Sequence, residues 1–321
     1  MSEAALVLLA ALLLDALLGD PEWLWRRLPH PITLIGRLID YFDRQFNLTD
    51  TALGTRRRLG VMVLLLLLAG AIVAGLALSF LLKALPFGWV VEILVVAVFL
   101  AQRSLCQHVG RVARSFQEEG LSGARRSVAL IVGRDPEKLD EPGICRAAIE
   151  SLAENFSDGV VAPAFWYLVA GVPGLLAYKV LNTADSMIGH RSERHAAFGW
   201  ATARLDDLAN LPASRLSAFL ILLTTAPHRW QDTVRALWHD APNHRSPNAG
   251  WPEAAMGAGL SIALAGPRSY GTQQVEDAWM NAAGRRDASP EDIRRAVALC
   301  WRSFALLVLA VALIAAGDLL F

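Results

Sequence analysis

The chain has 321 residues, of which 54% are hydrophobic and 19% are charged. Soluble domains are about 45–50% apolar and about 25% charged, so this composition excludes an ordinary soluble protein. Thirty basic residues balance thirty acidic residues, which excludes the strong positive field of a typical nucleic-acid-binding protein. The three cysteines are far apart in the sequence, which excludes a disulfide scaffold and a Cys-x-x-Cys site. The composition indicates an integral membrane protein.

Four apolar segments are predicted to cross the membrane as helices. A hydrocarbon core of about 30 Å requires roughly 20 helical residues at about 1.5 Å each. The first segment follows Glu3 and lacks the basic region of a signal peptide, so we interpret it as a retained helix. Ser289-Pro290 predicts the N-terminus of the helix that leads into the last segment. The predicted spans are residues 4–19, 59–82, 86–105 and 303–320.

Three further apolar segments are weaker candidates. The first of them contains Gly171 and Pro173, which break or kink helices, and the other two are short for a full crossing. We predict kinked, re-entrant or partial membrane segments here. Strand signals are absent, so the predicted fold class is all-α, a polytopic helical bundle forming one integral membrane domain over residues 1–321 with cytoplasmic helical loops. The weaker segments are residues 159–178, 213–227 and 254–267.

The distribution of basic residues predicts the orientation in the cell membrane. The segment 20–58 carries seven arginines and the segment 102–158 carries eight basic residues, whereas the link after the second span has only Lys83. Because cytoplasmic loops are rich in Lys and Arg, we place both basic segments in the cytoplasm and the N-terminus outside. The polar motifs of residues 179–215 are also expected on the cytoplasmic side.

Glu150, Glu154 and Asp158 recur every four residues. This spacing places three carboxylates on one face of a helix, where they repel each other. A cation or a cationic substrate would relieve the repulsion. The alternative is a solvated acidic stripe at the end of a helix.

Two further polar clusters border the same apolar segments. Asn182 and Asp185 follow the Pro/Gly-broken segment, and Asp206, Asp207 and Asn210 precede the next one. Carboxylate and amide oxygens are the hard ligands that suit Mg²⁺ held together with substrate phosphates. With the acidic triplet they predict one shared site, although acids also flank helices routinely and similar acid pairs serve other phosphate-handling transferases.

Arginines and a turn-rich loop supply candidate anion and substrate contacts. His190-Arg191 and Arg194-His195 are suited to phosphate or carboxylate groups, and the alternative is contact with lipid headgroups. In the loop that contains Ser246 and Asn248, both side chains can donate and accept hydrogen bonds, but a plain structural turn explains them as well. The sequence has no P-loop, G-x-G-x-x-G, H-E-x-x-H or G-x-S-x-G motif, so a nucleotide would require an unfamiliar site.

Together these motifs resemble one family from about residue 10 to residue 275. The chain resembles the adenosylcobinamide-phosphate synthases of cobalamin biosynthesis, the CbiB/CobD membrane proteins. The hydrophobic C-terminal helix is consistent with this family but is not specific to it. The motifs that carry the resemblance are Asp15, Gly19-Asp20-Pro21, His30-Pro31, Glu150-Ser151, Glu154-Asn155, Asp158-Gly159, Pro163, Pro173-Gly174, Tyr178, Asn182-Thr183, Asp185-Ser186-Met187, Gly189, Phe198-Gly199, Ala203-Arg204, Asp206-Asp207, Asn210, Pro212 and Ser246-Pro247-Asn248-Ala249-Gly250.

The resemblance implies an amide ligation that uses ATP and Mg²⁺. The family joins the propionate carboxyl of adenosylcobyric acid to the amine of (R)-1-aminopropan-2-ol or its O-phosphate. The lipid bilayer and later cobalamin-pathway enzymes are the other expected partners, and no nucleic acid is expected.

The residue chemistry suggests how the roles divide. The candidates for catalysis are Glu150, Glu154, Asp158, Asp206 and Asp207, and those for metal binding are Glu154, Asp158, Asp185, Asp206 and Asp207. The candidates for substrate binding are Asn155, Asn182, Arg191, Arg204, Asn210, Ser246 and Asn248.

Two other functions fit some of the same features. Intramembrane acids and broken helices are typical of transporters, although the sequence shows no inverted repeat. Another Mg²⁺-dependent membrane transferase that acts on a lipid phosphate would also use paired acids.

Overall fold

The computed structural model describes residues 2–133, 136–190, 192–270, 273–275 and 277–320. The described chain is predominantly helical, which confirms the all-α prediction. The chain divides into two compact units, which are described separately below. In the described part of the chain, four helical segments are long and apolar enough to cross a membrane, namely Leu53–Ala84, Gly88–Val128, Glu141–Ile188 and Pro290–Gly317. They overlap the predicted spans 59–82, 86–105 and 303–320 and the weaker segment 159–178, whereas the predicted span 4–19 corresponds to the shorter helix Ser2–Leu18.

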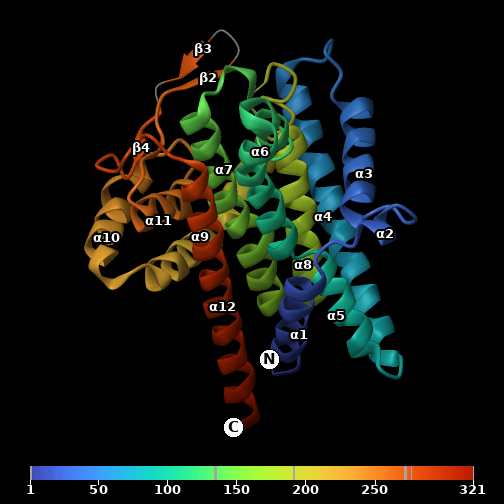
Figure 1. Ribbon diagram of the computed structural model, residues 1–321. Coiled ribbons are helices and arrows are strands. Elements are labelled where there is room, and N and C mark those ends of the chain that lie inside the picture. Colours follow the sequence, from blue (N-terminus) through green and yellow to red (C-terminus); the bar gives the residue numbers. More distant parts are fainter. Residues whose placement is uncertain (1, 134–135, 191, 271–272, 276, 321) are drawn as a thin grey trace. The chain divides into compact units, whose positions relative to one another are not determined.

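The first unit contains Met1–Leu100, Ala162–Asn210 and Ile314–Phe321. Its helices (Figure 1) are α1 (Ser2–Leu18), α2 (Glu22–Trp25), α3 (Pro31–Phe46), α4 (Leu53–Ala84), α5 (Gly88–Val98), α8 (Ala162–Ile188) and the first part of α9 (Trp200–Thr224).

The second unit contains Ala101–Val161 and Leu211–Leu313. It holds the rest of α9 and most of α12 (Pro290–Leu320), which starts where Ser289-Pro290 predicted. Its other elements are α6 (Gln102–Val128), η1 (Pro136–Lys138), α7 (Glu141–Phe156), the π-helical turn η2 (Ser157–Val161), η3 (Pro227–Arg229), α10 (Trp230–His239), η4 (Ala241–Asn243), α11 (Gly250–Leu260), β1 (Leu264–Ala265), β2 (Arg268–Tyr270), β3 (Gln273–Val275) and β4 (Trp279–Met280).

Three details differ from the sequence-based expectations. The helix expected over residues 86–105 is interrupted at 99–101, since α5 ends at Val98 and α6 begins at Gln102. In the apolar segment 254–267, α11 ends at Leu260 and Ser261 adopts a left-handed conformation (φ 58°), which stops the helix. The segment is largely buried within its unit. Two small antiparallel sheets, β1–β4 and β2–β3, were not expected, since strands of two or three residues are too short to show an alternating pattern.

Helices α4 and α8 form the core of the first unit. Val63, Leu67 and Ala71 of α4 pack in one buried cluster with Val180 and Ala184 of α8. The absence of a side chain on two glycines lets the backbone of α4 approach α8 at Pro173 and the segment before α9 at Phe198. A Cβ built on Gly75 would lie 2.5 Å from Pro173 Cα, and one built on Gly60 would lie 1.9 Å from Phe198 O.

Helix α8 is broken at Ala170 and Gly171, where Gly171 has a φ of 61°. A Cβ built on Gly174 would lie 2.4 Å from Trp166 O. Eight residues of a straight helix rise about 12 Å, so the chain must bend sharply between Trp166 and Gly174. The break falls among the glycines and prolines that predicted it; the depth of this segment in the lipid stays a prediction.

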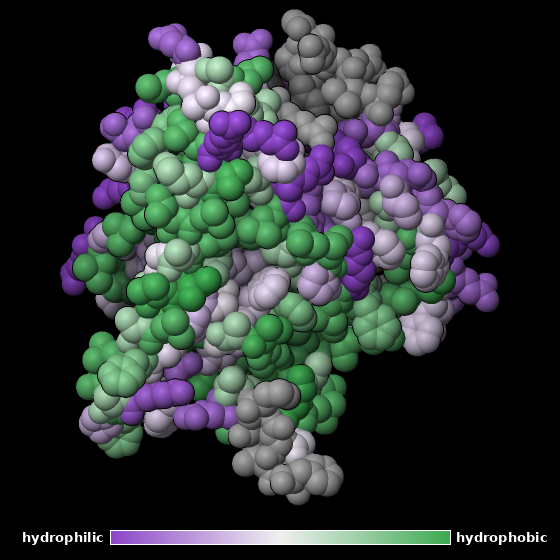
Figure 2. Space-filling view, turned by 180° about the vertical axis from the view of Figure 1, so that it is seen from behind, coloured by the Kyte–Doolittle hydropathy of each residue, from purple (hydrophilic) through white to green (hydrophobic). Residues whose placement is uncertain are grey.

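Large hydrophobic side chains remain exposed on the helix surfaces. Figure 2 shows them in green over a large part of the visible face. On α4 they include Leu65, Val73 and Phe80, which are 62%, 64% and 79% exposed. Apolar patches of this kind mark a surface in contact with lipid or protein, and the length of α4 favours lipid.

The contact between α4 and α8 predicts a difference between two glycines of the same helix. We expect Gly75→Ala to destabilise the protein by about 1–3 kcal/mol, because the added methyl group meets the backbone of Pro173. Gly70→Ala is the matched control, since a Cβ there meets nothing within 4 Å, and alanine favours a helix by up to about 1 kcal/mol. Thermal unfolding of the detergent-purified protein, followed by circular dichroism, measures both. Equal melting temperatures for the two variants would contradict the packing described.

Candidate functional site

A cluster of acidic and amide side chains forms within the first unit between the C-terminal part of α8 and the start of α9. Asp206 is 7% exposed and Asn210, one helical turn later, is 1% exposed. Asn210 Nδ2 donates to Asp206 Oδ2 at 2.9 Å, and Tyr178 Oη of α8 donates to Asn210 Oδ1 at 2.9 Å. This chain of hydrogen bonds fixes one face of the Asp206 carboxylate.

The other carboxylate oxygen of Asp206 is in a different situation. Asp206 Oδ1 is buried, and no described residue supplies a hydrogen bond to it. A buried polar atom without a partner is uncommon in a folded protein, because its desolvation is not offset. This oxygen is therefore a candidate ligand atom for a cation or a substrate donor.

Neighbouring acids add to the electrostatic strain. Burial is the main cause that raises the pKa of Asp206 to about 7, and the negative charges of Asp185 and Asp207 raise it further. The amides of Asn210 and Asn182 act in the opposite direction. We call Asn182, Asp185, Asp206, Asp207 and Asn210 the α8–α9 acidic cluster.

One arginine is paired with this cluster. Arg204 Nη1 lies 3.6 Å from Asp207 Oδ2, but the Arg204 side chain is 59% exposed, so solvent weakens the pair. Lys179 is buried on α8 directly after Tyr178 and was missed at the sequence level, because a single lysine in an apolar helix gives no spacing signal.

The donor set of the cluster suits Mg²⁺ that is shared with a substrate. In the part of the chain that the structure describes, no three His, Cys, Asp or Glu side chains are arranged to hold a metal by themselves. Mg²⁺ is commonly bound by one or two carboxylates together with substrate phosphates and waters. Asp206 with its unpartnered oxygen, and Asp185 and Asp207 beside it, fit that mode of binding.

The predicted acidic triplet lies in the second unit, and its members have different environments. Glu150 is 4% exposed, and its Oε1 accepts a hydrogen bond from the backbone N–H of Ala265 at 2.8 Å, which fastens β1 to α7. Glu154 is exposed one turn later. Asp158 lies in the π-helical turn η2, so the α-helical spacing that predicted one shared face does not extend to it.

Asn155 is exposed beside Glu154, and its side-chain amide bonds locally. Asn155 Nδ2 donates to Ser151 O at 2.8 Å and to Ser151 Oγ at 3.2 Å. Ser151 Oγ donates to Ile131 O at 2.8 Å. These bonds hold the end of α7 in place, and they leave the Asn155 side-chain oxygen as its candidate contact for a substrate.

Ser246 and Asn248 shape their own loop in the second unit. Ser246 Oγ accepts from the backbone N–H groups of Asn248 and Ala249, each at 3.2 Å. Asn248 Oδ1 accepts from Ser214 Oγ at 3.1 Å and from Arg215 Nη1 at 3.0 Å. These contacts are those of a structural turn, which was one of the two interpretations of this loop.

The sequence did not predict two contacts near this loop, an arginine beside a tryptophan and a histidine beside a glutamate. The Arg215 guanidinium lies 4.6 Å from the ring centre of Trp251. His244 Nε2 lies 3.7 Å from Glu253 Oε2, and both side chains are nearly buried. A histidine and a glutamate nine positions apart across a turn share no periodicity, so the sequence carried no signal for this pair.

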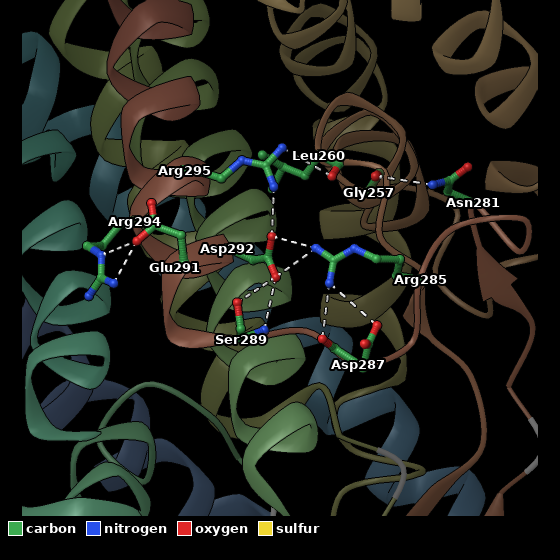
Figure 3. Close-up of polar contacts among 10 residues, drawn as sticks. All are labelled: Gly257, Leu260, Asn281, Arg285, Asp287, Ser289, Glu291, Asp292, Arg294 and Arg295. Atoms are coloured by element: carbon green, nitrogen blue, oxygen red, sulfur yellow. Dashed lines mark hydrogen bonds and ion pairs between the residues drawn. The ribbon is translucent and has the colours of Figure 1, made fainter. Parts of the chain in front are cut away.

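Asp292 is the centre of a third polar group that was missed. Figure 3 shows two arginines and a serine pointing toward its buried carboxylate. Arg285 Nη2 donates to both Asp292 oxygens at 2.9 and 3.0 Å, and Arg295 Nη1 donates at 2.9 Å. Ser289, directly before α12, donates through N and Oγ. These bonds satisfy the carboxylate and anchor the segment before α12, so we assign Asp292 a structural role.

The basic segment after α8 also makes internal contacts. Arg194 Nη2 lies 2.6 Å from Asp43 Oδ2, and His195 Nε2 lies 3.4 Å from Asp43 Oδ1. Burial opposes the charge on Asp43, but the hydrogen bonds from Arg194 and Asn47 prevail and lower its pKa. Arg194 thus forms an ion pair with Asp43 within the protein, in place of the predicted contact with a phosphate or carboxylate ligand. Arg191 lies outside the described residues.

The structure therefore brings part of the predicted site together within one unit. Asn182, Asp185, Asp206, Asp207, Asn210 and Arg204 belong to the first unit. Glu150, Glu154, Asn155, Asp158, Ser246 and Asn248 belong to the second unit.

Comparisons with known proteins cover nearly the whole chain. A family model described as CobD/Cbib protein matches residues 8–300. A cobalamin biosynthesis protein CobD from Rhizobium meliloti (strain 1021) is 52% identical over 325 residues, which cover 100% of this chain and 99% of that protein. A protein of the same description from Rhodobacter capsulatus is 44% identical over 315 residues, with 97% of each chain covered. No solved structure matches.

The buried charge of Asp206 predicts a pH-dependent effect on stability. The pKa of the Asp206 carboxyl rises from its ordinary value of 3.8 to about 7 on folding. The folded protein therefore loses stability as the pH increases between these two values. At pH 8 without Mg²⁺ we expect Asp206→Asn to be more stable than the wild type by about 2 kcal/mol, a fraction of the full shift because water and relaxation screen it. The difference should shrink toward pH 4. Thermal melts between pH 4 and pH 8 measure it, with exposed Asp50→Asn as the control, and a pH-independent difference would contradict the electrostatic explanation.

Proposed function

The chain belongs to the CobD/CbiB family of cobalamin biosynthesis proteins, and we propose that it is an ATP- and Mg²⁺-dependent amide ligase. Its substrates in this proposal are adenosylcobyric acid and (R)-1-aminopropan-2-ol or the O-phosphate of that amino alcohol. The product is adenosylcobinamide or its phosphate. The observation that supports the proposal most strongly is the α8–α9 acidic cluster, in which Asp206 keeps an unpartnered oxygen beside two more carboxylates.

The proposed reaction needs activation of a carboxylate. A free carboxylate does not react with an amine at neutral pH, so ATP must first convert one carboxyl oxygen into part of a phosphate leaving group. The amine nitrogen then forms the C–N bond, the C–O bond to phosphate breaks, and the ammonium proton passes to a base. Mg²⁺, when bound, neutralises the charge of the phosphates.

Each residue of the cluster has a specific part in this proposal. Asp206, Asp185 and Asp207 would hold Mg²⁺, and a carboxylate not bound to it would accept the proton of the attacking amine. Asn210 already bonds to Asp206 and Tyr178, so it is a positioning residue. The Asn182 amide stabilises the charged form of Asp206, and in this proposal it also donates to phosphate or to a corrin amide.

Arginine provides the phosphate contact. Arg204 has an exposed side chain on the turn of α9 that carries Asp206 and Asp207. A guanidinium presents paired donors that match phosphate oxygens. We assign Arg204 to the phosphate of ATP or of the amino alcohol, and Arg191 to the same class of contact.

The second unit contributes further candidates. At the end of α7, Glu154 and Asn155 are exposed and Asp158 is half-buried, and we propose that they contact Mg²⁺ or substrate. Glu150 positions β1 through its bond to Ala265, so its part is indirect. Ser246 and Asn248 keep the shape of a substrate-facing loop.

The location follows from the same chemistry. The apolar helices indicate a membrane protein. We propose that it lies in the cell membrane with the motif-bearing segments facing the cytoplasm, because basic residues are concentrated there and ATP is a cytoplasmic substrate. The bilayer would also gather later enzymes of the pathway beside it.

The ligation predicts a sharp loss of activity on neutralising the cluster. We expect Asp206→Asn and Asp207→Asn each to lower the rate of amide formation by about 100-fold or more, since each removes a carboxylate that holds Mg²⁺ near developing phosphate charge. Purified protein is given adenosylcobyric acid, the amino alcohol phosphate, ATP and Mg²⁺, and the amide and the released ADP or AMP are measured. Asp50→Asn is the control, because Asp50 is an exposed acid outside the cluster, and this variant should keep full activity.

Two results would contradict the ligase proposal. One is amide formation at the wild-type rate by folded Asp206→Asn protein. The other is movement of substrate across sealed vesicles without amide formation or ATP cleavage, which is the behaviour of a transporter.

A further inference from the structure

A cavity of about 610 Å³ lies in the first unit, and no residue of the α8–α9 acidic cluster lines it. Its walls come from the start of α1, the end of α4, the start of α5 and the break in α8. The polar side chains that line it include Glu3, Lys83, Glu92 and Tyr167. Nothing in the ligation proposed above uses these residues.

One partly buried hydrogen bond organises the polar part of this cavity. Tyr167 is 1% exposed, and its Oη donates to Glu92 Oε1 at 2.7 Å. Glu92 belongs to Gly88–Val128, one of the segments able to cross a membrane. An acid in such a segment is costly unless it has a partner or a function. The tyrosine engages one carboxylate oxygen of Glu92, so the other can accept from a ligand.

The two remaining charged groups carry opposite signs. Glu3 and Lys83 both line the cavity, and both are exposed to solvent. The cavity thus presents two carboxylates and one ammonium. A ligand with both a positive and a negative group complements this arrangement better than a simple anion or a simple cation.

The broken helix adds backbone acceptors. Ala170, Gly171 and Pro173 line the cavity, and the backbone at Ala170 and Gly171 is not helical. Pro173 has no N–H, so it cannot complete the helical hydrogen bond to the carbonyl of Val169. Irregular backbone at membrane depth is tolerated where it is buried in protein or lines a polar cavity, and broken helices provide ligand-binding groups in many membrane proteins.

Apolar and aromatic side chains surround the charged groups. Leu76, Leu82 and Leu85 line the cavity with Phe87 and Trp89. Phe87 and Trp89 are 73% and 55% exposed. Exposed aromatic residues at the ends of apolar helices lie at the level of lipid headgroups. The occupant is therefore expected to be amphiphilic.

We propose that this cavity binds the headgroup of a phospholipid that carries a primary ammonium group and a phosphate. The ammonium lies between Glu92 and Glu3 and donates to them, and the phosphate lies against Lys83. The acyl chains follow the apolar wall and the exposed side chains of α4 and α5. The broken part of α8 is then stabilised by a lipid, and the site is separate from the ligation chemistry.

The test measures lipid binding to the full-length protein without ATP or corrinoid. Native mass spectrometry of the detergent-purified chain, titrated with phosphatidylethanolamine, phosphatidylcholine and phosphatidylglycerol of equal chain length, gives the apparent affinities. We expect phosphatidylethanolamine to bind at least tenfold more tightly than the other two. Glu92→Gln and Lys83→Met should each weaken it about tenfold, whereas Glu118→Gln and Lys138→Met, exposed residues outside the cavity, should not change it.

Lys83→Met keeps the test decisive if Glu92→Gln disturbs the fold, since Lys83 does not bond to Tyr167. Soluble O-phosphoethanolamine is added as a competitor, and we expect no displacement at concentrations comparable to the lipid. Equal affinity for the three lipids, or unchanged affinity in folded Lys83→Met protein, would overturn the proposal. Full displacement by the soluble compound would also overturn it, because the ligand would then be a free phosphorylated amine. Ligase activity does not enter these measurements, so failure here leaves the proposed function untouched.

Discussion

The repulsion among Asp185, Asp206 and Asp207 is the constraint on which this account of the protein depends. Asp206 is buried, the amides of Asn210 and Asn182 stabilise its charge, and its Oδ1 has no hydrogen-bond partner in the described structure. Burial of a carboxylate beside two others opposes folding unless a cation compensates. Asn210 is in turn held by Tyr178, so the fold maintains this unfavourable arrangement with dedicated bonds. Functional sites are where proteins keep such strain.

The packing of the first unit explains how that arrangement is maintained. Gly60 and Gly75 let α4 approach Phe198 and Pro173 to backbone distance, which fixes both the broken part of α8 and the chain just before α9. The ion pair of Asp43 with Arg194 ties the intervening segment to α3. The carboxylates of the cluster are therefore carried by helices whose positions are set by close backbone contacts within their unit, which limits relaxation away from one another.

Local sequence patterns predicted much of this structure, but the pairing of residues far apart in the sequence could not be predicted from them. The apolar run of α4, the break at Gly171 and the start of α12 at Pro290 follow from length, from conformational freedom and from capping, which are properties of neighbouring residues. Asp206 was likewise found from its spacing to Asn210. In contrast, Glu150 bonds to Ala265 and Asp43 pairs with Arg194, which are 115 and 151 positions away, and such pairing depends on how the chain folds back. The π-helical turn at Asp158 changes the helical period without a visible sequence signal.

Metal binding by the purified protein shows whether the acidic cluster holds a cation. Mn²⁺ has the ligand preferences of Mg²⁺ and is detected by electron paramagnetic resonance, so a titration with and without ATP counts the bound ions. We expect one class of Mn²⁺ site that strengthens at least tenfold with ATP, is lost in Asp206→Asn and is retained in the exposed Asp50→Asn variant. Wild-type Mn²⁺ binding by the folded Asp206→Asn protein would show that the carboxylates between α8 and α9 hold no metal.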